Sequence, residues 1–111
     1  MAILTKVRAT YNTPVNVTTG AVACDAVSDS FSGIGNEWVT FVNGATTATV
    51  AFAVPQGLRT IVNDSTLAIP ANTTVTVRVP PPDTHRTTGG LYTMVYTTST
   101  TLKALVQSLT A

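Results

Sequence analysis

The sequence predicts an all-β protein: a small antiparallel β-sandwich or barrel, jelly-roll-like, with seven to nine short strands. Threonine fills about a fifth of the 111 positions and alternates with valine and other apolar residues. Alternating β-branched residues are typical of a strand whose outward face is hydroxyl and methyl. Proline, glycine and asparagine interrupt these runs at short intervals, as turns between strands require.

The first third of the chain is predicted to hold two strands and a loop. Residues 3–10 alternate along one wetter face, which predicts a strand that ends at the turn signal of residues 12–14. Residues 15–27 form a run of mostly small residues that fits a short strand between loops. Residues 29–36 contain two serines, two glycines, an aspartate and an asparagine, and we therefore expect a loop.

The strongest local pattern lies in the middle of the chain. Residues 37–42 and 46–54 read as two strands, and Asn43-Gly44 stands between them. Asn-Gly accepts the positive φ angles of a type I′ turn, whose twist suits antiparallel strands. The pattern therefore predicts a β-hairpin.

Short strands and turns alternate in the following segment. A break is predicted at residues 55–57, because proline lacks the N–H group that a strand interior needs. The remaining signals predict strands at 58–62, 66–69 and 73–79, with turns at 63–65 and 70–72.

The last third begins with three prolines at 80–82, which end the preceding strand. We expect a polar loop over 83–90 and an alternating strand over 91–98. Apolar residues in 102–109 fit a helical stripe and also a strand. The threonine-rich residues before them disfavour a helix, so we expect a final edge strand.

Composition and charge restrict the class of partner. Charged residues make up 10% of the chain, the net charge is +1 and the mean hydropathy is +0.30. The scattered basic residues form no stripe for nucleic acid, and no run reaches the roughly 20 apolar residues of a membrane span. The N-terminus lacks the build of a signal peptide. We expect a single β domain over 20–111, preceded by a strand or arm over 1–19, and no nucleic-acid or membrane partner.

The titratable residues suggest no catalytic or metal site. Asp25 and Asp29 could share a loop, but they lack the dense oxygen spacing of a calcium loop. His85 reads as an exposed loop residue, and Cys24 reads as a small buried apolar residue. One histidine and one cysteine are too few for structural zinc. No paired acid and base stand out, so we expect no enzyme activity and no cofactor.

The aromatic residues read mainly as core. Trp38 and Phe41 are expected on opposite faces of one strand. Tyr92 and Tyr96 share a face with Met94, as expected for a stripe between two sheets.

Five segments give the chain a characteristic order of strands and turns. They comprise an aromatic strand that runs into Asn-Gly, a Thr/Val strand, a Pro-Ala turn with a Val-rich strand, a proline cluster, and a closing strand with two tyrosines: residues 37–44, 49–50, 69–77, 80–82 and 90–96. Over residues 20–109 this order resembles small β-rich virion proteins of tailed bacteriophages, of the capsid decoration (cement) type.

The resemblance implies a structural role without catalysis. Such proteins commonly form homotrimers and bind the outer surface of an icosahedral capsid across capsomer junctions. The implied partners are the major capsid protein and further copies of this chain, and the implied location is the virion, after synthesis in the host cytoplasm. We expect the contact residues in the N-terminal stretch and the proline-rich loop, at Leu4, Lys6, Arg8, Tyr11, Pro80, Pro81, Pro82, Asp83 and Arg86.

Two other functions fit the same composition. The first is another phage structural part, such as a neck, tail or head-fibre component, which shares the fold logic and differs in its partner. The second is a carbohydrate-binding or adhesin module, which requires exposed aromatic side chains at Trp38, Tyr92 or Tyr96.

Overall fold

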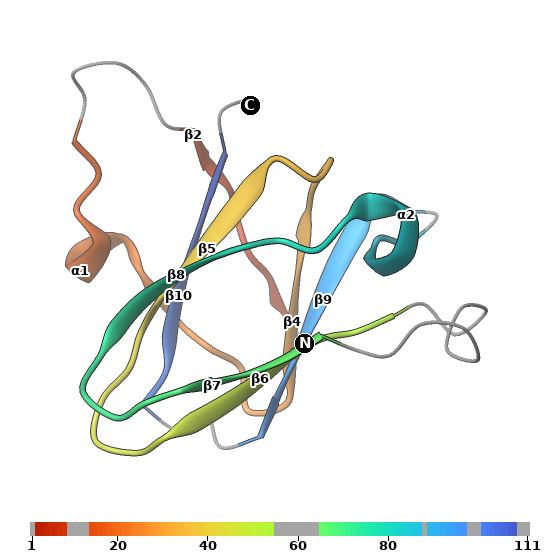
Figure 1. Ribbon diagram of the computed structural model, residues 1–111. Coiled ribbons are helices and arrows are strands. Elements are labelled where there is room, and N and C mark those ends of the chain that lie inside the picture. Colours follow the sequence, from red (N-terminus) through yellow and green to blue (C-terminus); the bar gives the residue numbers. More distant parts are fainter. Residues whose placement is uncertain (1, 9–13, 55–64, 88, 98–100, 109–111) are drawn as a thin grey trace.

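Two β-sheets pack face to face in the computed structural model, which describes residues 2–8, 14–54, 65–87, 89–97 and 101–108 (Figure 1). Sheet A has the strand order β1-β4-β9-β6-β7, with β1 Ala2–Ile3, β4 Ser28–Ser32, β9 Leu91–Thr97, β6 Ala48–Phe52 and β7 Ser65–Ile69. Sheet B has the order β2-β10-β5-β8, with β2 Val7–Arg8, β10 Lys103–Ser108, β5 Glu37–Val42 and β8 Thr74–Arg78. The short strand β3 Val22–Ala23 also pairs with β10.

Four antiparallel strand pairs are nested in sequence order, with β6–β7 as the innermost pair. β6 pairs with β7, β5 with β8, β4 with β9, and β3 with β10. The further pairs β6–β9 and β5–β10 then join these into the two sheets. This is the pairing scheme of a jelly roll. The predicted fold class is therefore confirmed, as a sandwich of two sheets.

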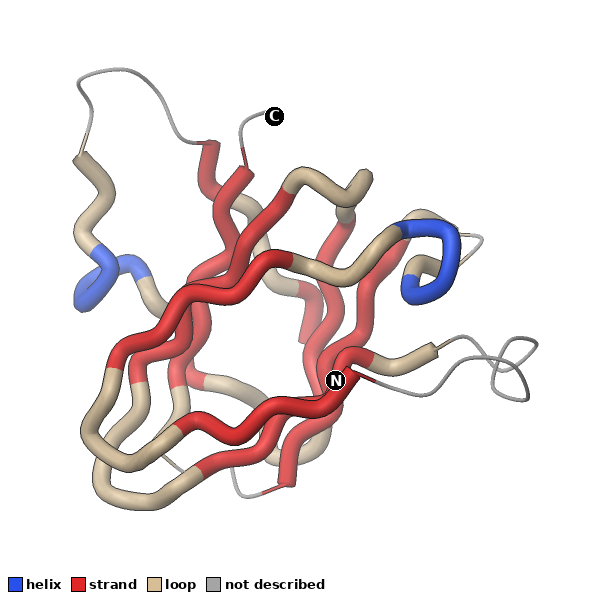
Figure 2. Tube along the Cα trace, in the orientation of Figure 1, coloured by secondary structure: helices blue, strands red, loops and turns tan. Residues whose placement is uncertain are grey.

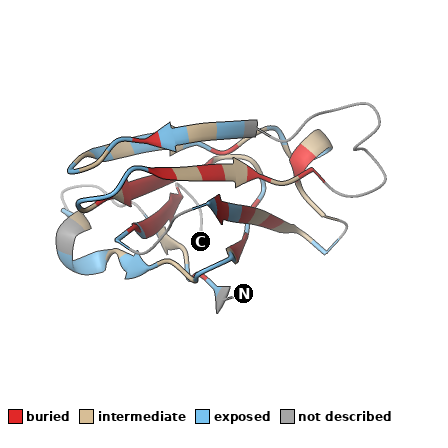
Figure 3. Ribbon diagram, turned by 90° about the horizontal axis from the view of Figure 1, so that it is seen from below, coloured by how far each residue is buried: buried red, intermediate tan, exposed pale blue. Residues whose placement is uncertain are grey.

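The core lies between the sheets and is built from alternate residues of the long strands. Tyr92 and Met94 of β9 face Phe31 of β4 on the same inner face, and all three side chains are fully buried. The rings of Phe31 and Tyr92 stack with their centroids 5.5 Å apart. Figure 3 shows buried residues concentrated in the strands, whereas the turns and the edge strands carry most of the exposed ones.

Five predicted strands appear where the sequence placed them, and one of them is β6, which lies within the prediction at 46–54. The other four are β5, β7, β8 and β9, which match the predictions at 37–42, 66–69, 73–79 and 91–98. Trp38 and Phe41 lie on opposite faces of β5, with Phe41 fully buried and Trp38 half-buried. The predicted break at 55–57 and the strand at 58–62 lie outside the described residues.

The predicted loop at 29–36 is wrong in its first half, because β4 occupies residues 28–32. Two polar residues of β4, Asp29 and Ser30, are buried with hydrogen-bond partners supplied by distant parts of the chain. Tyr96 Oη donates to Asp29 Oδ2 at 2.8 Å, and the hydroxyls of Ser30 and Thr93 lie 3.1 Å apart. A buried polar side chain is tolerated when it is hydrogen-bonded. Here the hydrogen-bond partners are distant in the sequence, so the local sequence does not reveal them.

The predicted Asn43-Gly44 hairpin is also wrong, because β5 and β6 belong to different sheets. Neither residue has the positive φ that a type I′ turn requires. The Asn43 side-chain amide instead donates to the carbonyls of Thr46, Ile69 and Pro70 at 2.8 to 3.2 Å. Asn43 therefore fastens the crossing between the sheets to the turn that follows β7.

The C-terminal segment is a strand, as predicted, but it is not an edge strand. β10 pairs with β5 along one side and with β3 and β2 along the other. Residues 15–27 hold the predicted short strand only at β3, preceded by the single helical turn α1 Val17–Gly20. Asn16 caps this turn by accepting a bond from the Thr19 N–H. A second helical turn, α2 Pro82–His85, begins at the last of the three prolines and replaces the first part of the polar loop predicted at 83–90.

The two sides of the sandwich, where the outermost strands of the two sheets lie, differ in whether another segment of the chain joins the sheets. On one side, residues 2–8 cross from sheet A to sheet B, since β1 pairs with β4 and β2 with β10, both in parallel. Leu4 lies between them and belongs to the core. On the other side are the edge strands β7 and β8, joined by the turn at 70–73 (Figure 2). We call these the closed side and the open side.

Candidate binding surfaces

His85 is buried and not exposed, which corrects the prediction from sequence. The α2 turn carries it inward, leaving 5% of the residue accessible, and its Nδ1 lies 2.6 Å from Thr84 Oγ1. Within the described residues, no group of three or more His, Cys, Asp or Glu side chains could hold a metal ion. No helix in this part of the chain is long and apolar enough to cross a bilayer.

Asp29 forms the centre of a buried polar group beside Cys24. The Asp25 backbone N–H and Tyr96 Oη both donate to Asp29 Oδ2, at 3.1 and 2.8 Å. Burial raises the pKa of the Cys24 thiol to about 11 and also raises the pKa of Tyr96. Both groups are therefore protonated at neutral pH, so the cluster supports the fold and offers no nucleophile.

A second polar group surrounds Glu37, which is fully buried. Its carboxylate accepts the backbone N–H of Ile34 at 3.0 Å and of Gly35 at 2.9 Å, and Lys6 Nζ lies 3.5 Å away. Gly35 has a φ of 103°, a conformation that glycine adopts at little cost. The carboxylate thus fixes the loop before β5 and connects it to the crossing N-terminal segment.

The proline-rich segment packs against this same loop. Arg86 Nη1 donates to the Gly33 carbonyl at 3.2 Å, and Tyr92 Oη donates to the Pro80 carbonyl at 2.9 Å. A Cβ atom at Gly35 would come within 2.8 Å of Pro82. Glu37 therefore connects Lys6 to the loop against which the proline-rich residues pack, although Lys6 and these residues were predicted as separate contact regions. We call residues 33–37 and 80–86, with Lys6, the proline end.

The predicted contact residues differ in accessibility. Arg8, Pro81 and Asp83 are exposed, whereas Lys6, Pro80, Pro82 and Arg86 are half-buried. Leu4 is buried in the core, and Tyr11 lies outside the described residues. Ile34, which the sequence did not single out, is 56% exposed at the proline end. Its glycine-flanked position in the chain is the only sequence signal for it.

The outer face of sheet A carries no charged side chain among its described residues. We call it the hydroxyl face, and it comprises Ile3, Ser28, Ser32, Thr49, Ala51, Thr66, Ala68, Leu91, Thr93, Val95 and Thr97, with the buried Ser30 between Ile3 and Thr93. Ile3 is 62% and Val95 38% exposed within it. The outer face of sheet B differs, because it carries Arg78 and Lys103.

A shallow hollow lies on the outer face of sheet B, beside Trp38. It has a volume of about 300 Å³ and is lined by Asn36, Trp38, Thr76 and Arg78. The Trp38 indole N–H donates to Gln107 Oε1 at 3.2 Å, which fixes the ring. The other two candidate aromatics, Tyr92 and Tyr96, are buried in the core and cannot form a surface platform.

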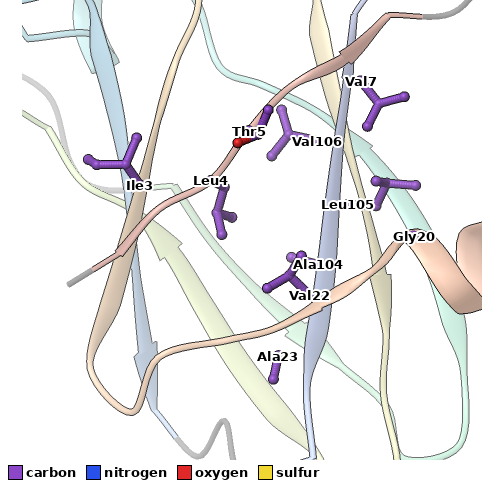
Figure 4. Close-up of a pocket in the computed structure, with 10 residues that line it drawn as sticks. All are labelled: Ile3, Leu4, Thr5, Val7, Gly20, Val22, Ala23, Ala104, Leu105 and Val106. Carbon is purple, nitrogen blue, oxygen red and sulfur yellow. The ribbon is translucent and has the colours of Figure 1, made fainter.

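An apolar cavity of about 340 Å³ lies on the closed side, where β2 and β3 approach β10 from either end (Figure 4). The crossing segment forms one wall through Leu4 and Val7, and Val22 forms part of the opposite wall. Neither β2 nor β3 pairs with Leu105 or Val106 of β10. The cavity is therefore a gap in strand pairing, lined mostly by apolar side chains together with Thr5, and none of its lining residues is titratable.

Comparison of the chain with protein-family models, with curated proteins and with solved structures finds no match.

Proposed function

We propose that this chain is a structural virion protein that binds the outside of a tailed-phage capsid and stabilises it across capsomer junctions. The observation that carries the proposal is the hydroxyl face. Ser, Thr, Ala, Val, Leu and Ile side chains on the five strands of sheet A form a surface without charge, on a chain that is itself poor in charge.

Such a face suits contact between proteins for a physical reason. Burying a charge in an interface costs free energy unless it is paired, whereas methyl groups gain free energy from burial and hydroxyl groups are buried at little cost once the partner completes their hydrogen bonds. Hydroxyls both donate and accept hydrogen bonds, so they adapt to different partner groups. Low net charge also limits repulsion between many copies that crowd on one shell.

The proline end supports the same role as a second, smaller contact. Its backbone is fixed by the Glu37 carboxylate and by the Arg86 bond to Gly33, so Ile34, Pro81 and Asp83 project from a prearranged loop pair. A prearranged loop loses little conformational entropy on binding. Several modest contacts in one homotrimer then add through effective concentration.

The direct test mixes purified protein with undecorated capsids and locates the bound copies by cryo-electron microscopy. Val95→Lys places a charge at the centre of the hydroxyl face, and Ala26→Lys places the same charge on an exposed turn as a matched control. We expect Val95→Lys to weaken capsid binding about tenfold or more, because an unpaired buried charge costs on the order of 2 kcal/mol. Equal binding by both variants would remove the hydroxyl face from the contact.

The same images separate the two phage locations. Copies spread over the whole shell indicate a decoration protein, whereas copies confined to one vertex or to the tail indicate a neck, tail or fibre component. Sedimentation of the free protein tests the homotrimer.

The hollow beside Trp38 supports a second candidate function, carbohydrate binding. An indole face with a neighbouring guanidinium and amide is the kind of site that packs against a sugar ring and bonds its hydroxyls. A glycan screen with the wild-type chain and with Trp38→Ala tests it. Saturable binding that Trp38→Ala abolishes would establish it, and a flat screen would dismiss it.

A further inference from the structure

The outer edge of β8 presents backbone hydrogen-bonding groups that no described strand uses. The Val79 N–H donates to the Glu37 carbonyl at 3.2 Å, and the Thr73 carbonyl accepts from the Asn43 N–H at 2.9 Å. The backbone groups of successive residues alternate between the two sides of a strand. These two bonds therefore determine which residues of β8 bond to β5 and which point their backbone groups outward. Val75 and Val77 therefore point their backbone groups toward β5. Thr74, Thr76 and Arg78 point theirs outward.

This edge lacks the features with which proteins usually protect a free strand. β8 contains no proline, and its single charge, Arg78, stands at its end. Proteins typically blunt edges with prolines, charges or bulges, because a free edge is a template for another strand. The side chains alternate as well: Thr74, Thr76 and Arg78 are exposed, whereas Val75 and Val77 are half-buried against the core.

We propose that the edge of β8 pairs with β8 of a second copy, antiparallel, about a twofold axis at Thr76. In this register Thr76 faces Thr76 of the other copy, and Thr74 faces Arg78. Every outward N–H and C=O group of the three residues then finds a partner. Val75 and Val77 meet on the inner face, and the two sheets B become one continuous sheet.

The sequence of β8 favours this register over its neighbours. An axis at Arg78 would bring two guanidinium groups together, and an axis at Val77 would oppose Thr74 to Pro80, which has no N–H. An axis at Thr74 or Val75 would use Asn72, whose φ of 58° lies outside the strand region. Only the axis at Thr76 keeps the pairing inside the strand and places no like charges opposite each other.

This contact is independent of the proposed capsid role, because it involves two copies of the chain alone. It is twofold and therefore cannot build a trimer. In a homotrimer it would join neighbouring trimers to one another.

The first test exchanges charge on the proposed axis. Thr76→Lys and Thr76→Glu each place two like charges opposite each other, so we expect each variant alone to remain monomeric through β8. An equimolar mixture places Lys opposite Glu, and we expect it to associate. Thr97→Lys and Thr97→Glu are matched controls, since Thr97 is an exposed threonine of the central strand β9. Sedimentation velocity over a concentration series, without any capsid, is the measurement.

The second test removes one outward N–H. Thr76→Pro leaves the β5–β8 bonds in place, so we expect a folded chain by circular dichroism that has lost the association. Val77→Pro removes a bond to β5 and should unfold the sheet, which confirms the phase of the ladder. Thr76→Cys in a Cys24→Ala background should form a disulfide dimer under mild oxidation, and Thr97→Cys in the same background should not.

Three results would overturn the proposal: a wild-type chain that shows no concentration-dependent association through β8, a Lys and Glu mixture that stays apart, or equal cross-linking at positions 76 and 97. The capsid experiment is unaffected by any of them. Loss of capsid binding by Thr76→Pro in a chain that never self-associates would instead identify a capsid segment as the occupant of the edge.

Discussion

The closed side and the open side of the sandwich differ in what covers the outermost strands of the two sheets. On the closed side, residues 2–8 pair with β4 and then with β10, and Leu4 enters the core between them. On the open side, β7 and β8 end the sheets, and Leu67, Val75 and Val77 are only partly buried against the core. One side is thus completed by the chain itself, and the other keeps strand edges available.

The difference separates the requirements of folding from those of assembly. A sheet edge is an energetic liability unless it is covered or paired. The chain covers one side with its own N-terminal segment, fastened by the Lys6–Glu37 pair. Mutations should therefore change stability most on the closed side and association most on the open side.

Glu37→Ala should have the largest effect on stability. It leaves the N–H groups of Ile34 and Gly35 without their acceptor and leaves Lys6 without its carboxylate. Removing one partner of a buried ion pair costs about 3 to 5 kcal/mol. We expect a loss of this size in the free energy of unfolding measured with urea. Glu37→Gln keeps an acceptor oxygen and should cost less, and equal losses would mean that the carboxylate charge does not hold the loop.

Leu4→Ala should rank second. The Leu4 side chain is 8% exposed, and truncating a buried leucine costs about 2 to 3 kcal/mol at a site with some room to relax. Ile3→Ala is the matched control on the neighbouring residue, because Ile3 is mostly exposed and should change the free energy of unfolding by under about 0.5 kcal/mol. Similar losses for both variants would show that residues 2–8 do not close the sandwich as described.

Val77→Ala on the open side should cost about 1 kcal/mol in the dissociated chain, because the side chain is only half-buried before any partner arrives. The difference between Val77→Ala and Leu4→Ala should become clearer at higher protein concentration, where the chain associates. If a second copy covers Val77, its truncation should also weaken association, whereas Leu4→Ala should leave association unchanged once the chain is folded. Urea unfolding and sedimentation velocity measure the two effects separately.

Much of the fold could be predicted from the sequence, because strands such as β8 and β9 show a clear alternation of apolar and polar residues. The predictions fail where contacts with residues distant in the sequence determine the local structure. Asp29 and Ser30 read locally as loop residues, yet Tyr96 and Thr93 supply hydrogen-bond partners that allow them to lie in a buried strand. Asn43 reads as a turn residue, yet its amide bonds carbonyls more than twenty positions away.

The candidate surfaces were predicted in part for the same reason. The hydroxyl face follows directly from the threonine alternation. The indirect connection of Lys6 to the proline-rich segment does not, because it depends on the Glu37 carboxylate and on the loop that this carboxylate holds. Local patterns specify the faces of strands, whereas which ends and edges meet depends on long-range pairing.

Alkaline pH should also lower the free energy of unfolding, and the effect should originate on the closed side. The folded-state pKa of Cys24 is raised from 9.0 to about 11, mainly by burial. Below about pH 9 the thiol is protonated in both states, so its contribution to stability is complete. As the pH rises from 9 toward 11, the unfolded state loses this proton first, and the free energy of unfolding falls.

Cys24→Ala should flatten that decline when urea unfolding is compared at pH 8 and pH 10.5. The part of the decline that remains should reflect Tyr96, whose pKa is also raised by burial. A decline of the same slope in Cys24→Ala would mean that the thiol is as accessible in the folded chain as in the unfolded one, and that the closed side does not seal the group beneath it.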